Sequence, residues 1–493
     1  MKTIKAKLLT IAMLLCSISV SSYDFKVDGI YYDISSMEEL TVSVVSGDEK
    51  YSGEIVIPET VIFKERTLNV TGIGYSAFYR NDELTSVNIP NSVTTIEEDA
   101  FSYCSALQSI DIPNSVTSIG EYAFCYCESL QNINIPNGVT KIEEGAFSHC
   151  SALQSIDIPN SVKSIGAYAF CYCKSLQNIN IPNGVTKIEA KTFEGCKSLQ
   201  TIDLPNSVIT IGDRTFFSCT GLTSVNIPSS VKTIKSNAFA YCKNLANIIV
   251  DENNIIYDSR ENCNAIIETA TNTLIAGCKN TIIPNSVISI GNYAFSGCTS
   301  STSLVIPNSV TSIGDEAFYG CTSLLSLTIP NSVTCIGSST FYECTNLTNI
   351  HIGNSVKELS PAAFRGCTSL VHVTIGHSLE KIRHSVFVDC NKLETLMLGS
   401  PVPPTVDSDN FSNYNYIYTT LYVPKGTLAA YQAADVWKNF LYMEEYDIRG
   451  IENIQMDTDI APIYNLQGVQ MEETKESLPS GIYIQDGKKF IVK

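Results

Sequence analysis

Cysteine and histidine are the residue types in this sequence whose number and spacing could do chemistry. The 493 residues include 18 cysteines and five histidines, and such residues can hold a metal or, for cysteine, form disulfides. Twelve of the cysteines share one position, three residues after a recurring phenylalanine. They are Cys104, Cys127, Cys150, Cys173, Cys196, Cys219, Cys242, Cys298, Cys321, Cys344, Cys367 and Cys390. Their chemistry therefore depends on the element that repeats around them.

Other signatures of catalysis or metal binding are missing from the sequence. It has no phosphate-binding loop, no H-E-x-x-H, no G-x-S-x-G and no dinucleotide fingerprint. His372, His377 and His384 lie close together, but no nucleophile or carboxylate accompanies them in a matching role. Asp407 and Asp409 follow a proline-rich stretch and could hold calcium, but the glycine and distal glutamate of a calcium loop are missing. We predict no catalytic residue, no metal ligand and no cofactor, so the chain is not expected to be an enzyme.

The composition excludes one large class of partners. Acidic residues outnumber basic ones by 50 to 32, which gives a net charge of −18. Nucleic acid needs a basic surface, and anionic lipid is disfavoured for the same reason. With 44% hydrophobic residues the chain can bury a core, and after the N-terminus no apolar run is long enough to span a bilayer. Nucleic acid is therefore not expected as a partner, and no transmembrane segment is expected after the N-terminus.

One unit is written thirteen times along the chain. Phenylalanine recurs every 23 residues, apart from one step of 56 residues. The repeat positions are Phe78, Phe101, Phe124, Phe147, Phe170, Phe193, Phe216, Phe239, Phe295, Phe318, Phe341, Phe364 and Phe387. Such a period overrides the three-domain expectation from length and indicates a repeat architecture.

Each position of the unit has a physical reading. Ile110 and Ile112 alternate with a polar residue at strand period, and Pro113 ends the strand. Ile119 lies on a second short extended segment, and Phe124 contributes the largest apolar side chain of its coil. No coil can bury its apolar face alone, so neighbours must stack into a β-rich solenoid. We therefore predict a repeat solenoid of about 13 coils.

Stacking decides the chemistry of the cysteines. Strands in neighbouring coils lie ~4.8 Å apart, which is within disulfide range, but parallel side chains suit a ladder of free thiols better. Cys125/Cys127 and Cys171/Cys173 form C-x-C pairs without a partner pair at zinc spacing. We expect a structural column of buried thiols.

The residue two before the repeat proline forms the candidate ligand face. In the first half of the repeats it alternates between amide and carboxylate: Asn88, Asp111, Asn134, Asp157, Asn180, Asp203 and Asn226. Further on it becomes Ile249, Val305, Thr328, His351, Thr374 and Met397. Alternation avoids stacking like charges opposite one another. The face could bind a protein, a glycan or calcium, or it could be a solvated surface inherited from duplication of a 46-residue unit.

Two insertions interrupt the period. About nine residues are added between Pro58 and Gly72, and ten more within residues 251–280. Both are expected to be hairpins that project as loops. Such projections are contact sites in some solenoids and tolerated insertions in others.

The N-terminal residues 1–22 read as a signal peptide. Three lysines precede a short apolar run, and small residues precede the expected cleavage site before Tyr23. Leu15 stands before Cys16 where a lipoprotein would need a small residue, so ordinary export is favoured.

The ends of the repeat array need caps. We expect a β cap over residues 23–70, the solenoid over 71–400 and a strand-helix cap over 401–446. In the last of these, a helix around Leu428–Phe440 would bring Trp437 and Phe440 over the final coil. Residues 447–493 read as a β tail of three short strands, the last two joined by a hairpin turn at Asp486 and Gly487.

The repeat unit resembles the leucine-rich repeat of the BspA-like surface proteins of Bacteroidetes. The resemblance runs from residue 23 to about 446 and includes the opening YDFKVDGIYYDI and the closing LYVPKGTLAAYQAADVWKNF. The ending YNLQG…LPSGIYIQDGKKFIVK resembles the C-terminal sorting domain of the type IX secretion system, although it is shorter. These resemblances imply an exported protein, at the cell surface or outer membrane or secreted, some relatives of which adhere to host matrix proteins. We expect a non-enzymatic, adhesin-like binder of host or neighbouring-cell proteins; the alternative is a glycan- or nutrient-capture module.

Overall fold

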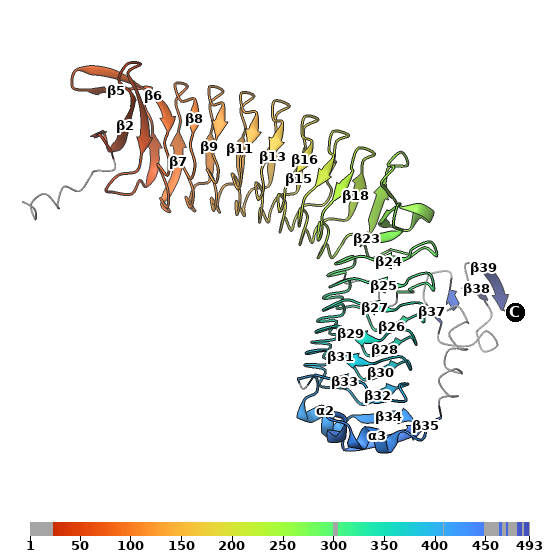
Figure 1. Cartoon of the computed structure of the whole chain (residues 1–493). Helices are drawn as coiled ribbons and strands as arrows, with labels where there is room; N and C mark the ends of the chain where they lie inside the picture. The colour runs from red at the N-terminus through yellow and green to blue at the C-terminus, as the bar shows by residue number, and fades with distance from the viewer. Residues whose placement is uncertain are drawn as a thin grey trace, which may run out of the picture.

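The chain winds into coils that stack one on the next in sequence order (Figure 1). The computed structural model describes residues 23–298, 304–407 and 409–447, together with four strands nearer the C-terminus. Each coil lays short strands beside the equivalent strands of its neighbours. Ile133, for example, pairs in parallel with Ile110 of the coil before it and Ile156 of the coil after it. The predicted β-rich repeat solenoid is confirmed.

Two rows of strands run along the solenoid. The first strand row precedes the repeat proline and consists of β4 (Gly53–Val56), β7 (Leu84–Asn88), β9 (Ser109–Asp111), β11 (Asn132–Asn134), β13 (Ser155–Asp157), β15 (Asn178–Ile179), β18 (Ser224–Ile227), β20 (Asn247–Val250), β26 (Ser326–Ile329), β28 (Asn349–Ile352), β30 (His372–Ile375), β32 (Thr395–Leu398), β34 (Thr420–Pro424) and β35 (Tyr442–Tyr446). The second strand row follows the proline and consists of β6 (Arg66–Ile73), β8 (Thr95–Ile96), β10 (Ser118–Ile119), β12 (Lys141–Ile142), β14 (Ser164–Ile165), β16 (Lys187–Ile188), β17 (Thr210–Ile211), β19 (Thr233–Ile234), β24 (Ser289–Ile290), β25 (Ser312–Ile313), β27 (Cys335–Ile336), β29 (Glu358–Leu359), β31 (Lys381–Ile382) and β33 (Thr405–Val406).

The repeat phenylalanines form the third side of each coil and the centre of the core. Phe124 lies on a turn, and its backbone N–H donates to the carbonyl of Ala146 in the next coil at 2.8 Å. The rings stack face to face along the solenoid. Those of Phe124 and Phe147 have centroids 5.6 Å apart and planes only 4° apart. This stacking between neighbouring coils explains why phenylalanine recurs at this position.

The N-terminal residues form the predicted β cap. Strands β1 (Phe25–Val27), β2 (Ile30–Ser36) and β3 (Thr41–Val45) pair antiparallel, and β3 then pairs in parallel with β6. Strand β5 (Thr60–Phe63) forms a hairpin with β6 that projects from the end of the rod, as expected for the first insertion (Figure 1). Strand β4 already belongs to the first strand row, so the ladder begins inside the region expected to be only a cap.

The C-terminal cap continues the rows before it closes them. Helices α2 (Asn413–Tyr418) and α3 (Leu428–Ala433) and the 3-10 turn η3 (Trp437–Asn439) cover the last coil. The expected single helix over Leu428–Phe440 is divided: α3 ends at Ala433, Ala434 is extended, and Val436 has a φ of 67° just before η3. Trp437 is fully buried, and its Nε1 donates to the Pro404 carbonyl at 2.7 Å. The expectation that Trp437 and Phe440 close the last coil is confirmed.

The second insertion does not project as a loop, and that prediction was wrong. Its strands β21 (Tyr257–Asp258), β22 (Ala265–Glu268) and β23 (Thr273–Gly277) stand within the second strand row, where β23 pairs in parallel with β24. A short 3-10 turn, η2 (Arg260–Asn262), joins the first two. Ile266 and Ile267 are both fully buried although they point to opposite faces. The hairpin is buried on both faces because coils lie on either side of it.

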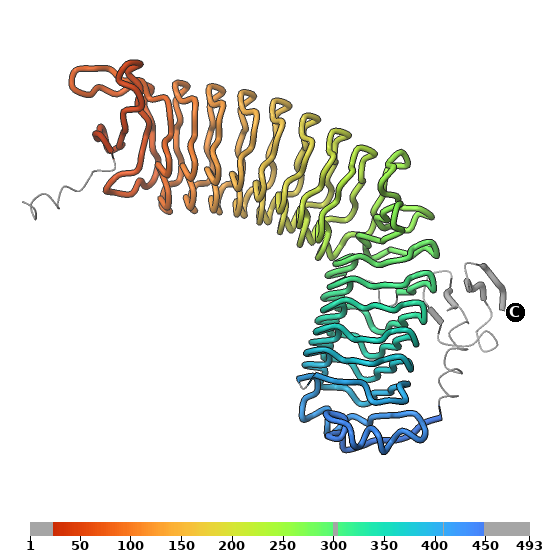
Figure 2. The backbone as a smooth tube through the Cα atoms, viewed as in Figure 1, coloured from red at the N-terminus to blue at the C-terminus, as the bar shows by residue number. Residues whose placement is uncertain are grey.

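The inserted hairpin divides the hydrophobic core. Ile266 packs with the core that precedes it, whereas Ile267 packs with the core that follows. The phenylalanine stack accordingly stops at Phe239 and starts again at Phe295. Extra strands widen one side of the solenoid only, and the rod bends into two arms at this point (Figure 2). We call the parts before and after it the N-terminal arm and the C-terminal arm.

A separate small sheet follows the solenoid in the chain. Strands β36 (Ile463–Asn465), β37 (Gln470–Met471), β38 (Gly481–Gln485) and β39 (Lys488–Val492) pair antiparallel in the order β37-β36-β38-β39. The predicted hairpin is confirmed, with Gln485 opposite Lys488, but the sheet has four strands where three were expected. The predicted signal peptide, residues 1–22, lies outside the described residues.

Candidate recognition surfaces

The cysteine column lies in the core and is not a reactive site. The seventeen cysteines that the structure describes are all free, and those of the column are buried apart from the half-buried Cys298. Eleven of the twelve column thiols donate to the carbonyl oxygen of the repeat phenylalanine of the preceding coil, and the thiol of Cys298 donates to the Gly277 carbonyl instead. For Cys127 this bond runs from Sγ to the Phe101 oxygen over 3.2 Å, and for Cys150 to the Phe124 oxygen over 3.1 Å. Each thiol therefore satisfies a carbonyl inside the core while packing as a small apolar side chain.

Burial also makes these thiols unreactive. It raises the pKa of Cys104, Cys344 and Cys390 to about 12. The thiolate is the reactive form, so raising the pKa lowers the reactive fraction at any pH below 12. Cys335 is the exposed cysteine of the described residues. At pH 8 we expect a thiol reagent to label the folded chain from Tyr23 onward at Cys335 first, and the column only after unfolding. Rapid labelling of many thiols in the folded chain, measured by mass spectrometry, would contradict the buried column.

The described residues contain no cluster of three or more histidine, cysteine or acidic side chains that could hold a metal. The nearest arrangement is His384, whose Nε2 lies 3.2 Å from Asp407 and whose Nδ1 lies 3.5 Å from Asp409. His384 is 71% exposed, and a surface ion pair of this kind contributes little to stability. His372 and His377 stand in other parts of the surface and are exposed.

The candidate ligand face forms one exposed column along the first strand row. Asn88 pairs with Asp111, Asn134 with Asp157, and Asn180 with Asp203 in successive coils. All seven polar members from Asn88 to Asn226 are exposed. In the C-terminal arm the column continues through Thr328, His351 and Thr374, of which the last two are half-buried.

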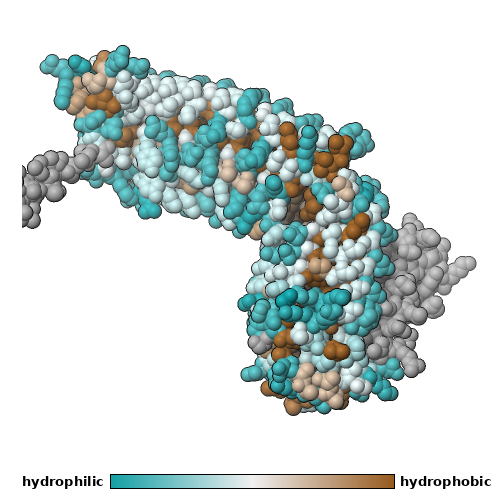
Figure 3. Space-filling model, in the orientation of Figure 1, coloured by the Kyte–Doolittle hydropathy of each residue, from teal (hydrophilic) through white to brown (hydrophobic). Residues whose placement is uncertain are grey.

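The structure adds an apolar member that the sequence reading missed. Ile282 stands two residues before Pro284 and is 75% exposed, next along the chain from Ile249 at 55% and followed by Val305 at 75%. The sequence signal was the repeat proline Pro284. This proline is easily overlooked, because the insertion lengthens the step between the repeat phenylalanines on either side of it. Exposed apolar side chains gather near the bend, whereas the N-terminal arm is mostly hydrophilic on the face in view (Figure 3).

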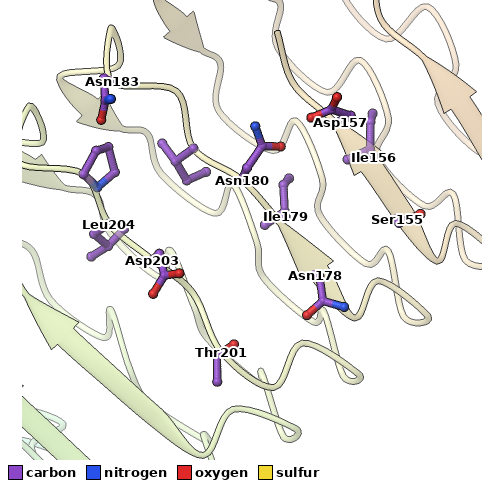
Figure 4. Close-up of a pocket in the computed structure, with 12 residues that line it drawn as sticks. Ser155, Ile156, Asp157, Asn178, Ile179, Asn180, Asn183, Thr201, Asp203 and Leu204 are labelled. Atoms are coloured by element: carbon purple, nitrogen blue, oxygen red, sulfur yellow. The ribbon is translucent and has the colours of Figure 1, made fainter. Parts of the chain in front are cut away.

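Three members of the polar column line a shallow cavity of about 690 Å³. Asp157, Asn180 and Asp203 form one row across three coils, and a second polar row lies beside it, formed by Ser155, Asn178 and Thr201 (Figure 4). The floor is apolar, and Ile179 and Leu204 keep 8% and 9% of their surface exposed. A second crevice of about 320 Å³ shares Asp157 and Asn180 and extends the cavity toward the N-terminus.

The cavity opens where the first strand row is interrupted. Strand β15 is the last of its sheet, and only an isolated bridge between Asn180 and Asp203 links it to the next coil. On the opposite side, toward β13, the backbone pairing ends at Ile179, and the side chain of Asn180 takes over part of the pairing there. Its Nδ2 donates to the Ile158 carbonyl at 3.0 Å, and its Oδ1 accepts from the Ile158 N–H at 3.1 Å. These two bonds hold the Asn180 amide in place at the centre of the cavity.

A second surface, which we call the aromatic ridge, lies over the turns of the N-terminal arm. It consists of Tyr79, Arg80, Tyr103, Tyr126, His149 and Tyr172. The rings of Tyr103 and Tyr126 stack with centroids 4.4 Å apart, and those of Tyr126 and His149 at 4.1 Å. The Arg80 guanidinium covers Tyr79 and Tyr103 at 5.4 and 5.2 Å. The sequence signal was an aromatic residue two positions after the repeat phenylalanine in four consecutive coils.

The backbone of the turns makes the aromatic ridge costly. Residues two before and two after the repeat phenylalanine, such as Tyr122 and Tyr126, have a φ of 53° and 59°. A left-handed conformation costs a residue other than glycine roughly 1–2 kcal/mol. In the C-terminal arm three of the five equivalent positions hold glycine, namely Gly297, Gly320 and Gly366, and the other two hold Glu343 and Asp389. Stacking contributes about 0.5–1.5 kcal/mol per ring pair and so offsets the strain of tyrosine.

No helix among the described residues has the length and apolar character that a membrane span requires.

Solved structures of other bacterial repeat proteins are similar to this chain. A leucine-rich repeat protein from Bacteroides ovatus is 27% identical, with a TM-score of 0.50 over 86% of this chain and 100% of that one. A leucine rich cell surface protein from Faecalibacterium prausnitzii is 24% identical, with a TM-score of 0.51 over 89% of this chain and 98% of that one. At this level of identity the similarity supports the fold and nothing further. No protein with a curated description matches the sequence.

The repeats also match a defined sequence family. The family described as the BspA type leucine-rich repeat region matches residues 71–179, 163–271 and 275–394 in six copies. These segments cover more than half of the 493 residues and include both arms. The chain therefore belongs to the BspA-type leucine-rich repeat family.

Proposed function

We propose that this chain is an exported cell-surface recognition protein that binds another protein in the manner of an adhesin. The family is a protein-binding repeat fold, and the relative from Faecalibacterium prausnitzii is described as a cell surface protein. The signal peptide predicted over residues 1–22 supports export. A tail that resembles a type IX sorting domain supports attachment to the surface of a Bacteroidetes cell.

The aromatic ridge is the observation that carries protein binding. Tyrosine and arginine dominate the energetic centres of protein interfaces, because they offer a large contact area with few rotatable bonds. Here the rings are already ordered by stacking, so little entropy is lost on binding. Tyr103 is 36% exposed and Tyr79 38% exposed, and Arg80 lies between them. Burial lowers the pKa of His149, so its imidazole is neutral at neutral pH.

The test is binding of the chain from Tyr23 onward to immobilised extracellular-matrix proteins, measured by surface plasmon resonance. We expect saturable binding that weakens about tenfold or more in the double variant Arg80→Ala/Tyr103→Ala, which corresponds to ~1.4 kcal/mol. A matched control exists in the C-terminal arm, where the Arg365 guanidinium lies 5.9 Å from the ring of Tyr342. The double variant Tyr342→Ala/Arg365→Ala should bind normally.

Two results would contradict the proposal. The first is that no matrix protein binds above background, and the second is that both double variants weaken binding equally. Display at the surface is tested separately by protease treatment of intact cells, in which a fully protected chain would exclude surface exposure.

A second function, glycan capture, is favoured by a different observation, the polar cavity on the first strand row.

A further inference from the structure

The two crevices on the first strand row form one elongated groove, which we call the strand-face groove. Its polar lining includes Asn114, Asn134, Asp157, Asn180 and Asp203, which belong to five successive coils. Four steps of ~4.8 Å between coils make the groove roughly 19 Å long. It is shallow and follows the solenoid axis, so an extended chain fits it better than a compact small molecule.

The lining chemistry selects the ligand. Every charged side chain in the groove is a carboxylate, since no lysine or arginine lines either crevice. An anionic ligand would meet Asp157 and Asp203 without a compensating cation, which disfavours it. Amides and carboxylates hydrogen-bond well to pairs of neighbouring hydroxyl groups, with the carboxylate accepting from both. The groove therefore suits an uncharged ligand that is rich in hydroxyl groups.

The apolar floor of the groove restricts the class of ligand further. Ile179 and Leu204 present apolar surface beneath the polar row. A pyranose ring likewise has an apolar and a polar part, since its faces carry C–H groups and its edge carries hydroxyl groups. A peptide would instead need an open strand edge or a deep apolar pocket for an anchor. Strands β7 to β13 are paired on both sides, and at β15, the last strand of its sheet, the coil that carries Asp203 occupies the place where a peptide strand would have to pair. The cavity is also shallow.

The spacing of the groove matches a polymer. Each coil offers one amide or carboxylate every ~4.8 Å, which is close to the length that one sugar unit adds to an extended glycan. Asn180 is held by its two bonds to Ile158, so the centre of the row is ordered before a ligand arrives. Order in the free state reduces the entropy lost on binding.

We propose that the strand-face groove binds a linear, uncharged oligosaccharide of about four sugar units that lies along the solenoid axis. The site is distinct from the aromatic ridge, so either proposal can fail while the other holds. Asp157 and Asp203 accept hydrogen bonds from the sugar hydroxyls, and Ile179 and Leu204 pack against a ring face.

Isothermal titration calorimetry on the chain from Tyr23 onward tests the proposal. The probes are cellotetraose, xylotetraose, mannotetraose and laminaritetraose, with tetragalacturonate as the charged comparison. We expect saturable binding of at least one uncharged tetrasaccharide, with an affinity that is the same at low and high salt. The double variant Asp157→Ala/Asp203→Ala should weaken it about tenfold or more. Both carboxylates are exposed, so the variant should fold, which thermal melting checks.

The matched control is Thr328→Ala, which alters the same column in the C-terminal arm and should leave the affinity unchanged. The proposal is overturned if no uncharged probe binds, if only tetragalacturonate binds, or if the groove variant and the control behave alike. Matrix-protein binding by the groove variant should remain normal, which separates this proposal from the first.

Discussion

Replacing Phe170 by alanine is expected to lower the free energy of unfolding by about 3–5 kcal/mol. Phe170 is fully buried, and its ring stacks between Phe147 at 5.6 Å and Phe193 at 5.7 Å. Removing it takes away buried apolar area and leaves a cavity. Both neighbours lose a stacking partner, and the two parallel strand rows hold the coils too firmly for the gap to close.

Urea denaturation followed by circular dichroism measures the effect. Because Phe170 belongs to the core before the inserted hairpin, the loss should fall on unfolding of the N-terminal arm. Lys174→Ala, four residues later in the same coil and exposed, serves as the control and should change stability by no more than about 0.5 kcal/mol. A Phe170→Ala protein as stable as Lys174→Ala would show that the phenylalanine stack does not hold the coils together.

Replacing Arg214 by alanine is expected to lower the free energy of unfolding by about 3 kcal/mol, the lower end of the range for a broken buried ion pair. The Glu194 side chain is only 5% exposed, and its Oε1 lies 2.7 Å from Nη2 of Arg214, which is 33% exposed. The guanidinium also covers the ring of Phe217 at 3.9 Å. Without Arg214 the Glu194 carboxylate remains buried with no opposing charge. We expect the lower end of the free-energy range because the Arg214 side chain is itself partly exposed to solvent.

A pair on the surface provides the comparison. Nζ of Lys187 lies 2.6 Å from Oε2 of Glu189, and the two side chains are 51% and 35% exposed. Lys187→Ala should cost only about 0.2–1 kcal/mol, because water solvates the remaining carboxylate. In the double variant Glu194→Ala/Arg214→Ala the uncompensated charge is gone, so it should be more stable than Arg214→Ala alone. If Arg214→Ala costs no more than Lys187→Ala, the pair does not stabilise the arm.

The 23-residue period by itself determined most of the solenoid. Each coil has neighbours with the same sequence pattern, so the surroundings of Phe124 or Cys127 could be read from the repeat as if they were local. The two strand rows, the phenylalanine stack and the thiol column follow from that equivalence. The exposed polar column follows too, because side chains alternate along a strand.

Where neighbouring coils are not equivalent, only the tertiary structure decided which residues are buried and which contacts they make. Residues 251–280 read as a hairpin, but only the apposition of two arms shows both faces of β22 and β23 buried. Asn180 has the same type and position as Asn134, and yet its amide replaces backbone pairing at Ile158 and shapes the groove. The aromatic ridge depends on backbone φ values that the sequence pattern does not contain. Where every neighbouring coil repeats the same sequence pattern, the sequence alone determines the surroundings of a residue. At an interruption, those surroundings depend on contacts between segments that the 23-residue period does not relate.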